Sequence, residues 1–139
     1  KNQYDQAIEN YENALTHGLD DAKPTQINIA NLYNNLGDSY YNNKQYNKAI
    51  EYYEKALKIW LDIFGTNHSI VANSYYNLGI SYNDNNQYDK AIEHYEKALK
   101  INLDIFGTNH SDVANSYYNL GISYNYNGQY DKAIEHYEK

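Results

Sequence analysis

The sequence predicts an all-α protein of the helix-turn-helix solenoid type, a stack of about seven antiparallel helices. Three observations support this class. A unit of 42 residues recurs without gaps along the 139-residue chain. Nonpolar residues inside the unit follow helical spacing, and no sustained stretch alternates in the manner of a strand. A single globular core does not require such a period, whereas a solenoid does, because each unit packs against its neighbours.

The copies of the unit are nearly identical. Residues 69–97 and 111–139 agree at 26 of 29 positions, and residues 27–68 and 69–110 agree at 30 of 42. We therefore divide the chain into a leading second helix with its linker (residues 1–24), repeat 1 (25–68), repeat 2 (69–110) and repeat 3 (111–139). The leading helix is expected from Tyr4 to about His17, and the second helix of repeat 3 is truncated.

One nonpolar face marks the first helix of each repeat. In repeat 2 the nonpolar residues recur at spacings of 4, 3 and 4, which is the pattern of one helix face. They are Val71, Tyr75, Leu78 and Tyr82. Ser69 and Ser111 are expected to be the N-caps of these helices, because a hydroxyl can accept a hydrogen bond from an unpaired backbone N–H. Gly79 is expected to let the second helix approach closely.

A tight turn and a longer second helix complete each repeat. Asn86 and Gly128 occupy equivalent places in the turn, and both residue types tolerate the left-handed backbone conformation. The second helix of repeat 2 starts at Tyr88 and is expected to end near Phe106, where Gly107 can supply a C-terminal cap.

These residues resemble the tetratricopeptide repeat, whose pattern is a large aromatic, Leu-Gly, Tyr, and then Ala, an aromatic and Ala. Repeat 2 carries the pattern as Tyr75, Leu78-Gly79, Tyr82, Ala91, Tyr95 and Ala98. The common repeat has about 34 residues and a Pro after its second helix, whereas this unit has 42 residues and places Leu61 and Leu103 there. The linker DIFGTNHSDVA is similar to that of the kinesin light chain version of the repeat. The resemblance implies a right-handed superhelix.

The resemblance also implies a function, because tetratricopeptide arrays are non-catalytic protein-protein interaction scaffolds. They hold a peptide segment in a concave groove lined by the first helices. Carried over to this sequence, the groove would receive three sets of peptide-binding residues. Repeat 1 supplies Asn31, Asn34, Asn35 and Asp38. Repeat 2 supplies Asn73, Tyr76, Asn77 and Ile80. Repeat 3 supplies Asn115, Tyr118, Asn119 and Ile122. An Asn amide suits peptide backbone, since it both donates and accepts hydrogen bonds.

The groove residues argue against one subtype of this family. Chaperone-binding members grip a C-terminal carboxylate with Lys or Arg beside Asn. The mapped groove contains no Lys, and the chain contains no Arg. Ile80, Ile122 and Asp38 hold the places where an Asn would complete such a clamp. An acidic C-terminal tail is therefore a poor ligand, and Asp38 and Asp84 favour a neutral or basic peptide instead.

Two readings of the Asn rows remain open. Asn numbers 22 and Tyr 19, and both have A/T-rich codons, so genome composition explains the rows as well as a peptide-binding ladder does. The alternative function is a structural, self-assembling array. Tyr4–Leu15 is a near copy of the start of the last helix, so one molecule could place it where the 130–139 segment of another belongs. A consensus-like repeat protein with no dedicated ligand is the third possibility.

Composition excludes several other classes. The formal net charge is −7, which disfavours nucleic-acid binding, and no long nonpolar run suits a membrane span. There is no Cys, and His68 and His110 lie in linkers where a role in the turn is expected rather than a metal site. No nucleophile, base and orienting group recur as a catalytic arrangement, and no phosphate-binding loop is present. We expect a cytoplasmic protein without cofactor, metal or catalytic residues, whose partner is a protein or peptide.

Overall fold

The computed structural model describes the backbone of residues 3–21 and 26–137, and the side chains of all of these except 15–21, 130 and 131. Every regular element within these residues is an α-helix, which confirms the predicted all-α class. The helices belong to two compact units, residues 1–63 and 64–139, which are described in turn. The predicted linker around residue 24 lies outside the described residues.

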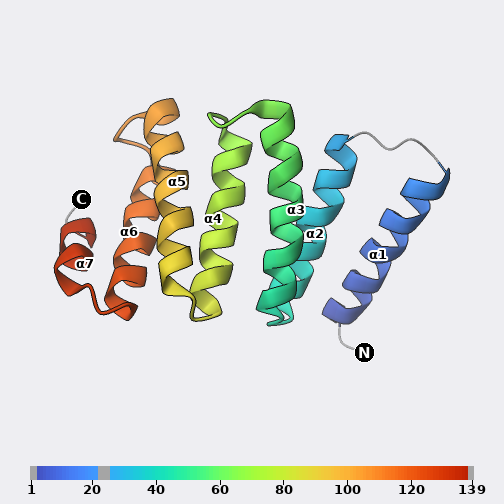
Figure 1. Ribbon diagram of the computed structural model, residues 1–139, viewed down its shortest axis with the longest axis horizontal. Coiled ribbons are helices and arrows are strands. Elements are labelled where there is room, and N and C mark those ends of the chain that lie inside the picture. The colour runs from blue at the N-terminus through green and yellow to red at the C-terminus, as the bar shows by residue number, and fades with distance from the viewer. Residues whose placement is uncertain (1–2, 22–25, 138–139) are drawn as a thin grey trace. The chain divides into compact units, whose positions relative to one another are not determined.

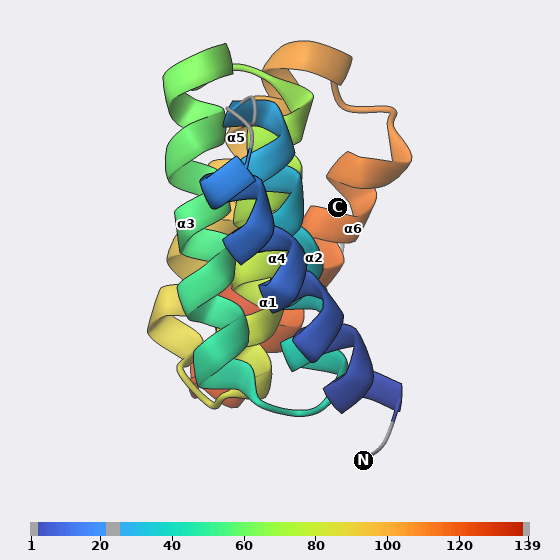
Figure 2. The same cartoon turned by 90° about the vertical axis from the view of Figure 1, so that its right-hand side faces the viewer.

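The first unit contains α1 (Gln3–Asp21), α2 (Gln26–Asn42) and nearly all of α3 (Tyr46–Phe64). Helix α1 extends beyond the predicted end near residue 17 and packs on α2, as Figure 2 shows from the side of α1. The Asn43 Nδ2 atom donates to Asp5 Oδ1 at 3.1 Å and ties the end of α2 to the start of α1. The core residues of this unit include Ile8, Leu36, Tyr53 and Trp60.

The second unit contains α4 (Ser69–Asp84), α5 (Tyr88–Phe106), α6 (Ser111–Tyr126) and α7 (Tyr130–Tyr137). Each helix packs on the next, and successive helices run in opposite directions (Figure 1). Leu78 and Leu120, from equivalent places in the repeat, are fully buried, and Tyr95 is 2% exposed. The Leu-Gly and Ala positions of the repeated pattern and its later aromatics therefore form the helix-packing core, as the sequence predicted. The first aromatic of the pattern, Tyr75 in repeat 2, is only half-buried.

The turns between paired helices follow the prediction. Asn86 and Gly128 adopt φ angles of 63° and 80°, and Lys44 adopts 62° at the equivalent place in the first unit. Helix α5 ends at Phe106, and Gly107 follows it with φ 78°. Its backbone N–H donates to the Leu103 carbonyl, so Gly107 supplies the expected C-terminal cap.

The predicted N-caps are wrong by one residue. His68 and His110, not Ser69 and Ser111, cap α4 and α6. The Nδ1 atom of His110 accepts a hydrogen bond from the Asp112 backbone N–H at 3.1 Å, and His68 does the same for α4. The His110 ring stacks on Phe106 with centroids 4.0 Å apart, which fixes the imidazole against the end of the preceding helix. The expected role of these histidines in the turn is thereby confirmed.

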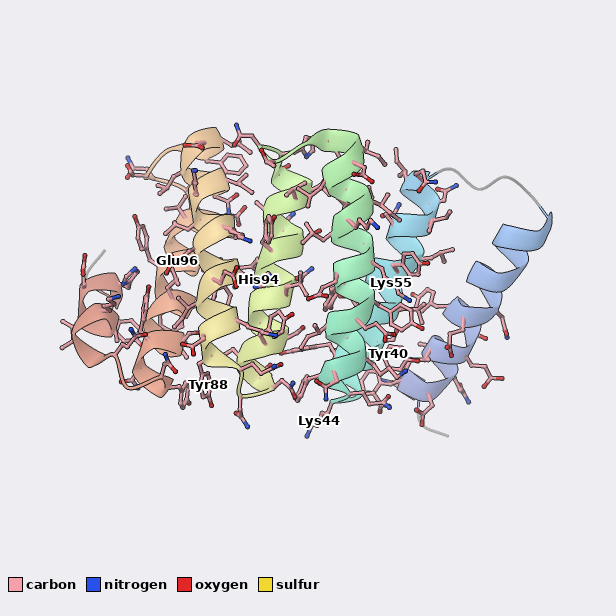
Figure 3. All side chains as sticks on the ribbon, in the orientation of Figure 1. Tyr40, Lys44, Lys55, Tyr88, His94 and Glu96 are labelled. Carbon is pink, nitrogen blue, oxygen red and sulfur yellow. The ribbon has the colours of Figure 1, made fainter. Side chains whose placement is uncertain are left out.

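Two polar side chains of α5, His94 and Glu96, contact the neighbouring helices α4 and α6. The His94 ring lies over α4, with centroids 5.0 Å from Tyr82 and 5.9 Å from Tyr75 (Figure 3). On the side of α6, the Glu96 carboxylate accepts the Tyr124 hydroxyl at 2.6 Å. Both contacts are made to tyrosines of the repeat pattern. The rings of Tyr75 and Tyr82 contact the His94 imidazole, and the Tyr124 hydroxyl donates to the Glu96 carboxylate.

Candidate functional site

The predicted groove residues of the second unit all remain at the surface of α4 and α6. Asn73, Asn115 and Tyr118 are exposed, and the other five are half-buried. Those five are Tyr76, Asn77, Ile80, Asn119 and Ile122. The same helices bury their opposite faces, with Val71 and Leu120 in the core. The side chains of the predicted set are therefore accessible to a ligand.

A hydrogen bond joins the two rows of predicted residues. Asn119 Nδ2 on α6 donates to the hydroxyl of Tyr76 on α4 at 2.7 Å, and also to the Asn115 carbonyl at 2.9 Å. Both amide protons of Asn119 are thus engaged within the protein, and its Oδ1 is the atom left to accept from a ligand. The sequence could not reveal this pairing, because it joins residues 43 positions apart.

Asn77 and Asn83 differ in what they offer. The side chain of Asn77 makes no hydrogen bond to any residue that the structure describes, so its amide can both donate and accept. Asn83, one turn beyond Ile80, accepts from Ser123 Oγ at 3.0 Å and fastens α6 to α4. The Asn row on α4 thus divides into a free amide and a structural one.

A hollow of about 110 Å³ opens between α4, α5 and α6. It is lined by Asn73, Tyr76, Asn102, Asp112 and Asn115. Asn102 and Asp112 were absent from the predicted site. The sequence did hold a signal for them: the residues 42 positions earlier are Trp60 and Ile70, so both positions change from nonpolar to polar between near-identical repeats.

The predicted residues of the first unit lie on α2, where Asn31 is exposed and Asn34 and Asn35 are half-buried. Asp38 accepts a short hydrogen bond from the Tyr53 hydroxyl of α3. Desolvation raises the pKa of the Asp38 carboxyl above its ordinary value, although the Tyr53 hydrogen bond acts in the opposite direction. This carboxylate is therefore partly committed to packing α3 against α2.

Two larger hollows of the second unit, about 350 and 510 Å³, lie along α5 among residues outside the predicted groove. The polar lining of the larger hollow includes Glu96, Tyr124 and His136, and the Tyr124 hydroxyl is already hydrogen-bonded to Glu96. No Ser or Cys nucleophile among the residues that the structure describes lines either hollow. The described residues contain no cluster of three His, Cys, Asp or Glu that could hold a metal ion. None of the described helices has the length and nonpolar character needed to cross a membrane.

Comparisons with known proteins agree with this architecture. The family model described as "Tetratricopeptide repeat" matches residues 28–104 and 77–139. The solved structure of BtubC (BKLC) from P. vanneervenii superposes with a TM-score of 0.87 at 27% identity, covering 98% of this chain and 54% of that one. A kinesin light chain candidate from Podospora anserina with nearly identical TPR-like repeats gives 0.82 at 23% identity, covering 98% and 64%. A search of curated proteins finds no match.

The fold also occurs in a protein whose name describes an enzyme. Aspartyl phosphate phosphatase F from Bacillus subtilis superposes with a TM-score of 0.80 at 22% identity, covering 98% of this chain and 36% of that chain. At this identity the likeness concerns the fold alone. The chain spans less than two thirds of the length of each of these three structures.

Proposed function

Because the chain belongs to the tetratricopeptide repeat family, we propose that it is a non-catalytic protein-protein interaction scaffold that binds an extended peptide segment on the exposed face of α4 and α6. Members of this family are generally protein-interaction modules. The proposal places the contact on Asn73, Tyr76 and Asn77 of α4, with Asn115 and Asn119 of α6 opposite them. We expect the protein to act in the cytoplasm.

The observation that carries this proposal is the free amide of Asn77 beside an accessible Tyr76. A fully buried amide without a hydrogen-bond partner would destabilise the fold. The half-buried amide of Asn77 is accessible to water and can exchange that water for a ligand. Tyr76 lies 5.7 Å from Tyr95 between ring centroids, so packing holds its ring in place. A fixed aromatic ring offers contact area at a low cost in side-chain entropy.

The residue types on this face favour certain peptides. Asn side chains can pair with backbone N–H and C=O groups of an extended chain in any sequence. Ile80 and Ile122 supply nonpolar contact between the Asn positions. No Lys lies among the proposed residues, and the chain lacks Arg, so a carboxylate-terminated acidic tail has no cation to bind. The predicted residues of α2 in the first unit are also mostly Asn, and Asp38 adds a carboxylate.

A peptide selection tests the proposal. The protein is immobilised and screened against a display library of random 12-residue peptides, and the affinity of each retained peptide is measured by fluorescence anisotropy. The double variant Asn77→Ala plus Asn119→Ala should weaken binding by at least about 10-fold, since each lost hydrogen bond contributes roughly 1 kcal/mol. The matched control is Glu93→Ala plus Lys97→Ala, which removes an exposed ion pair of α5 with a 3.6 Å N–O separation. The control should bind as the parent does.

Two results contradict the proposal. If retained peptides bind the groove variant with unchanged affinity, the peptide site is elsewhere. If no peptide is retained at all, the protein is better described as a repeat array without a dedicated peptide ligand. Circular dichroism of each variant shows whether the helices are intact.

A second function, self-association, is favoured by the open face of α7. Ile134 is 55% exposed and Tyr137 is 47% exposed, whereas their equivalents on α5, Ile92 and Tyr95, are 8% and 2% exposed. Tyr118 and Tyr126 of α6 extend this nonpolar surface. A second copy of the chain can bury these exposed residues at an interface between molecules.

Light scattering over a concentration series separates the two functions. Association through α7 predicts a mass that rises with concentration and falls back to the monomer in Ile134→Asp. The control Glu135→Gln changes a neighbouring exposed residue and should associate like the parent. A monomer at every concentration would exclude the self-assembling array, and the peptide-binding proposal would be unaffected.

A further inference from the structure

The hollow between α4, α5 and α6 has a lining that occurs once in the chain. Of its five residues, Asn73 and Asn115 are equivalent residues of successive repeats. The other three differ from the residues 42 positions earlier. Tyr76 stands in place of Asn34, Asn102 in place of Trp60, and Asp112 in place of Ile70. Three of the differences between the copies therefore lie around one small cavity.

Asn102 gives the cavity a polar floor. Its side chain is 4% exposed, yet it forms no hydrogen bond with any residue of the described part of the chain. No fully enclosed polar side-chain atom among these residues lacks a partner, so the amide of Asn102 must reach the opening of the hollow. An amide in such a setting has hydrogen-bonding capacity that a molecule entering the cavity can satisfy.

Asp112 gives the cavity a negative charge without a compensating cation. Its Oδ2 lies 3.8 Å from His110 Nδ1, but that nitrogen accepts the Asp112 backbone N–H and so presents a lone pair. The contact is therefore not an ion pair. No Lys of the described residues forms an ion pair with Asp112. Asp112 also lies in the first turn of α6, where a carboxylate stabilises the helix, so its structural and binding roles need separate tests.

Tyr76 forms one wall. Its hydroxyl oxygen accepts from Asn119, which leaves its proton without an acceptor among the described residues. Burial raises the pKa of Tyr76 above its ordinary value, the hydrogen bond from Asn119 lowers it, and the charge of Asp112 adds to the rise. The phenol is thus a neutral donor at physiological pH, and its ring offers a face to a cation.

The size and chemistry of the cavity fit one group. At about 110 Å³ it is smaller than the roughly 300–1,000 Å³ of cavities that hold whole small molecules, but it can admit the end of one side chain. A carboxylate would be repelled by Asp112, and a nonpolar group would leave Asn102 unpaired. A planar guanidinium has five donors in fixed directions, which a carboxylate and several amide oxygens can accept together. A lysine ammonium has three donors and a less directional fit.

We propose that this cavity is a specificity pocket for an arginine side chain of the bound peptide, with the guanidinium group paired to Asp112 and hydrogen-bonded to Asn102. The proposal rests on the peptide-binding function of the α4 and α6 face, and it names the chemistry of the peptide. Asn73 and Asn115 flank the entrance, and the ring of Tyr76 packs against the guanidinium plane. The net charge of −7 also draws basic segments toward the protein.

The first experiment uses N-acetyl-arginine amide as the probe, with the neutral isostere N-acetyl-citrulline amide as its control. Binding to the whole chain is followed by the side-chain amide resonances of Asn73, Asn102 and Asn115 in ¹⁵N-correlated NMR spectra. The arginine probe should shift these resonances in a saturable manner, while the citrulline probe should bind at least 10-fold more weakly. An arginine probe that shifts none of them, or a citrulline probe that binds equally well, would overturn the proposal.

Two variants separate a binding role from a structural one. Asp112→Asn retains the size of the side chain and should weaken arginine binding at least 10-fold. Asn102→Trp installs the residue of the preceding repeat and should fill the cavity and abolish binding. The control Asp89→Asn removes one charge from an exposed residue at the start of α5 and should leave binding unchanged. Equal binding by Asp112→Asn and the parent contradicts the pocket assignment, provided that circular dichroism shows both folded.

The peptide selection distinguishes the failure of this pocket from the failure of the groove. Retained peptides should be enriched in Arg, and replacing that Arg by citrulline should weaken binding at least 10-fold. If peptides bind through Asn77 and Asn119 without such enrichment and are insensitive to Asp112→Asn, the groove stands and the arginine pocket fails. If the arginine probe binds but no peptide does, the pocket stands and the peptide-scaffold function fails.

Discussion

The ring of Tyr95 occupies the space beside Gly79 that any larger residue would need. A Cβ atom built at position 79 would lie 2.6 Å from Tyr95 Cδ1. The glycine was expected to bring two helix backbones together, and its nearest neighbour proves to be this aromatic ring from α5 rather than backbone. The same relationship recurs between Gly121 and Tyr137, where the distance to Cε1 would be 2.7 Å.

Gly79→Ala should therefore destabilise the protein. Overpacking of a core costs about 1–3 kcal/mol, which exceeds the roughly 1 kcal/mol that alanine gains over glycine within a helix. Gly121→Ala is the matched comparison, because Tyr137 is 47% exposed and can move aside while Tyr95 is 2% exposed and cannot. Urea unfolding followed by circular dichroism measures both. Equal midpoints for the two variants would show that the ring contact does not limit position 79.

The histidine caps give a second prediction. His110→Ala should destabilise the start of α6 by about 1 kcal/mol for the lost cap, with a further loss from the Phe106 stack. Ser111→Ala should be close to neutral, since Ser111 is the first helical residue and not the cap. Thermal unfolding of the two variants measures the difference. A larger loss of stability in Ser111→Ala than in His110→Ala would indicate that Ser111 is the N-cap, as the sequence predicts.

The turn at Lys44 gives a third prediction. A side chain with φ near 60° costs about 1–2 kcal/mol per residue relative to glycine, which the equivalent Gly128 avoids. Lys44→Gly should raise the stability of the first unit, by somewhat less than this because glycine also makes the unfolded chain more flexible. Lys48→Gly is the control: it lies exposed inside α3 and should lose roughly 1 kcal/mol. Thermal melting temperatures report both, and a lower value for Lys44→Gly would contradict the turn geometry.

A fourth prediction concerns alkaline pH. Burial and the hydrogen bond to Glu96 raise the pKa of the Tyr124 hydroxyl well above its ordinary 10.0. Below pH 10 both the folded and the unfolded chain hold this proton, so its contribution to stability is constant. Above pH 10 the unfolded chain loses the proton more readily, and stability falls as pH rises. The decline should be shallower in Tyr124→Phe.

Denaturant titrations between pH 8 and 11 measure that slope. Tyr126→Phe is the control, because Tyr126 is 62% exposed and its loss removes a hydroxyl without a buried partner. Glu96→Gln should also reduce the slope, since it removes the charge that acts on Tyr124. A slope that is identical in the parent and in Tyr124→Phe would rule out this tyrosine as a source of the alkaline destabilisation.

The asymmetry between Asn77 and Asn119 gives a fifth prediction. Asn77→Asp removes amide donors that a peptide can use and should weaken peptide binding at least about 5-fold, from roughly 1 kcal/mol per hydrogen bond. Asn119→Asp should change binding much less, because the new carboxylate can accept the Tyr76 hydroxyl proton and retains an acceptor for the peptide. Each variant adds one negative charge, so the general electrostatic effect is matched. Fluorescence anisotropy with a selected peptide measures the affinity of each variant. Equal losses of affinity in Asn77→Asp and Asn119→Asp would refute the asymmetry.

Much of the fold could be predicted from the sequence because its signals are local and repeated. The helix spacing of Leu78 and Tyr82, the left-handed turn at Asn86 and the stop at Gly107 each depend on residues a few positions apart. The sequence did not predict the histidine caps for two reasons. Serine is a commoner N-cap than histidine, and the stacking of His110 on Phe106 depends on the path of the linker.

The site was less predictable for a physical reason. The predicted Asn and Tyr residues are accessible, but their individual capacities depend on contacts between repeats, such as that from Asn119 to Tyr76. The sequence places position 102 inside the second helix of repeat 2, but the amphipathic pattern does not show that the Asn102 side chain lines a cavity between α4, α5 and α6. The changes from Trp60 to Asn102 and from Ile70 to Asp112 between repeats are the signals of it in the sequence.

The hydrogen bond between Asn119 and Tyr76, like that between Ser123 and Asn83, joins residues about one repeat apart. Recombination between the near-identical copies would add or delete a whole unit and recreate the packing of neighbouring helices at the new junction. Asn102 and Asp112, however, have no duplicate at their repeat positions. Such an event could therefore change the length of the protein while its stability persists, and a single crossover between residues 60 and 112 could remove or transfer the polar cavity. Ligand preference and chain length would then change together when a crossover exchanges Asn102 or Asp112, and separately when it retains both.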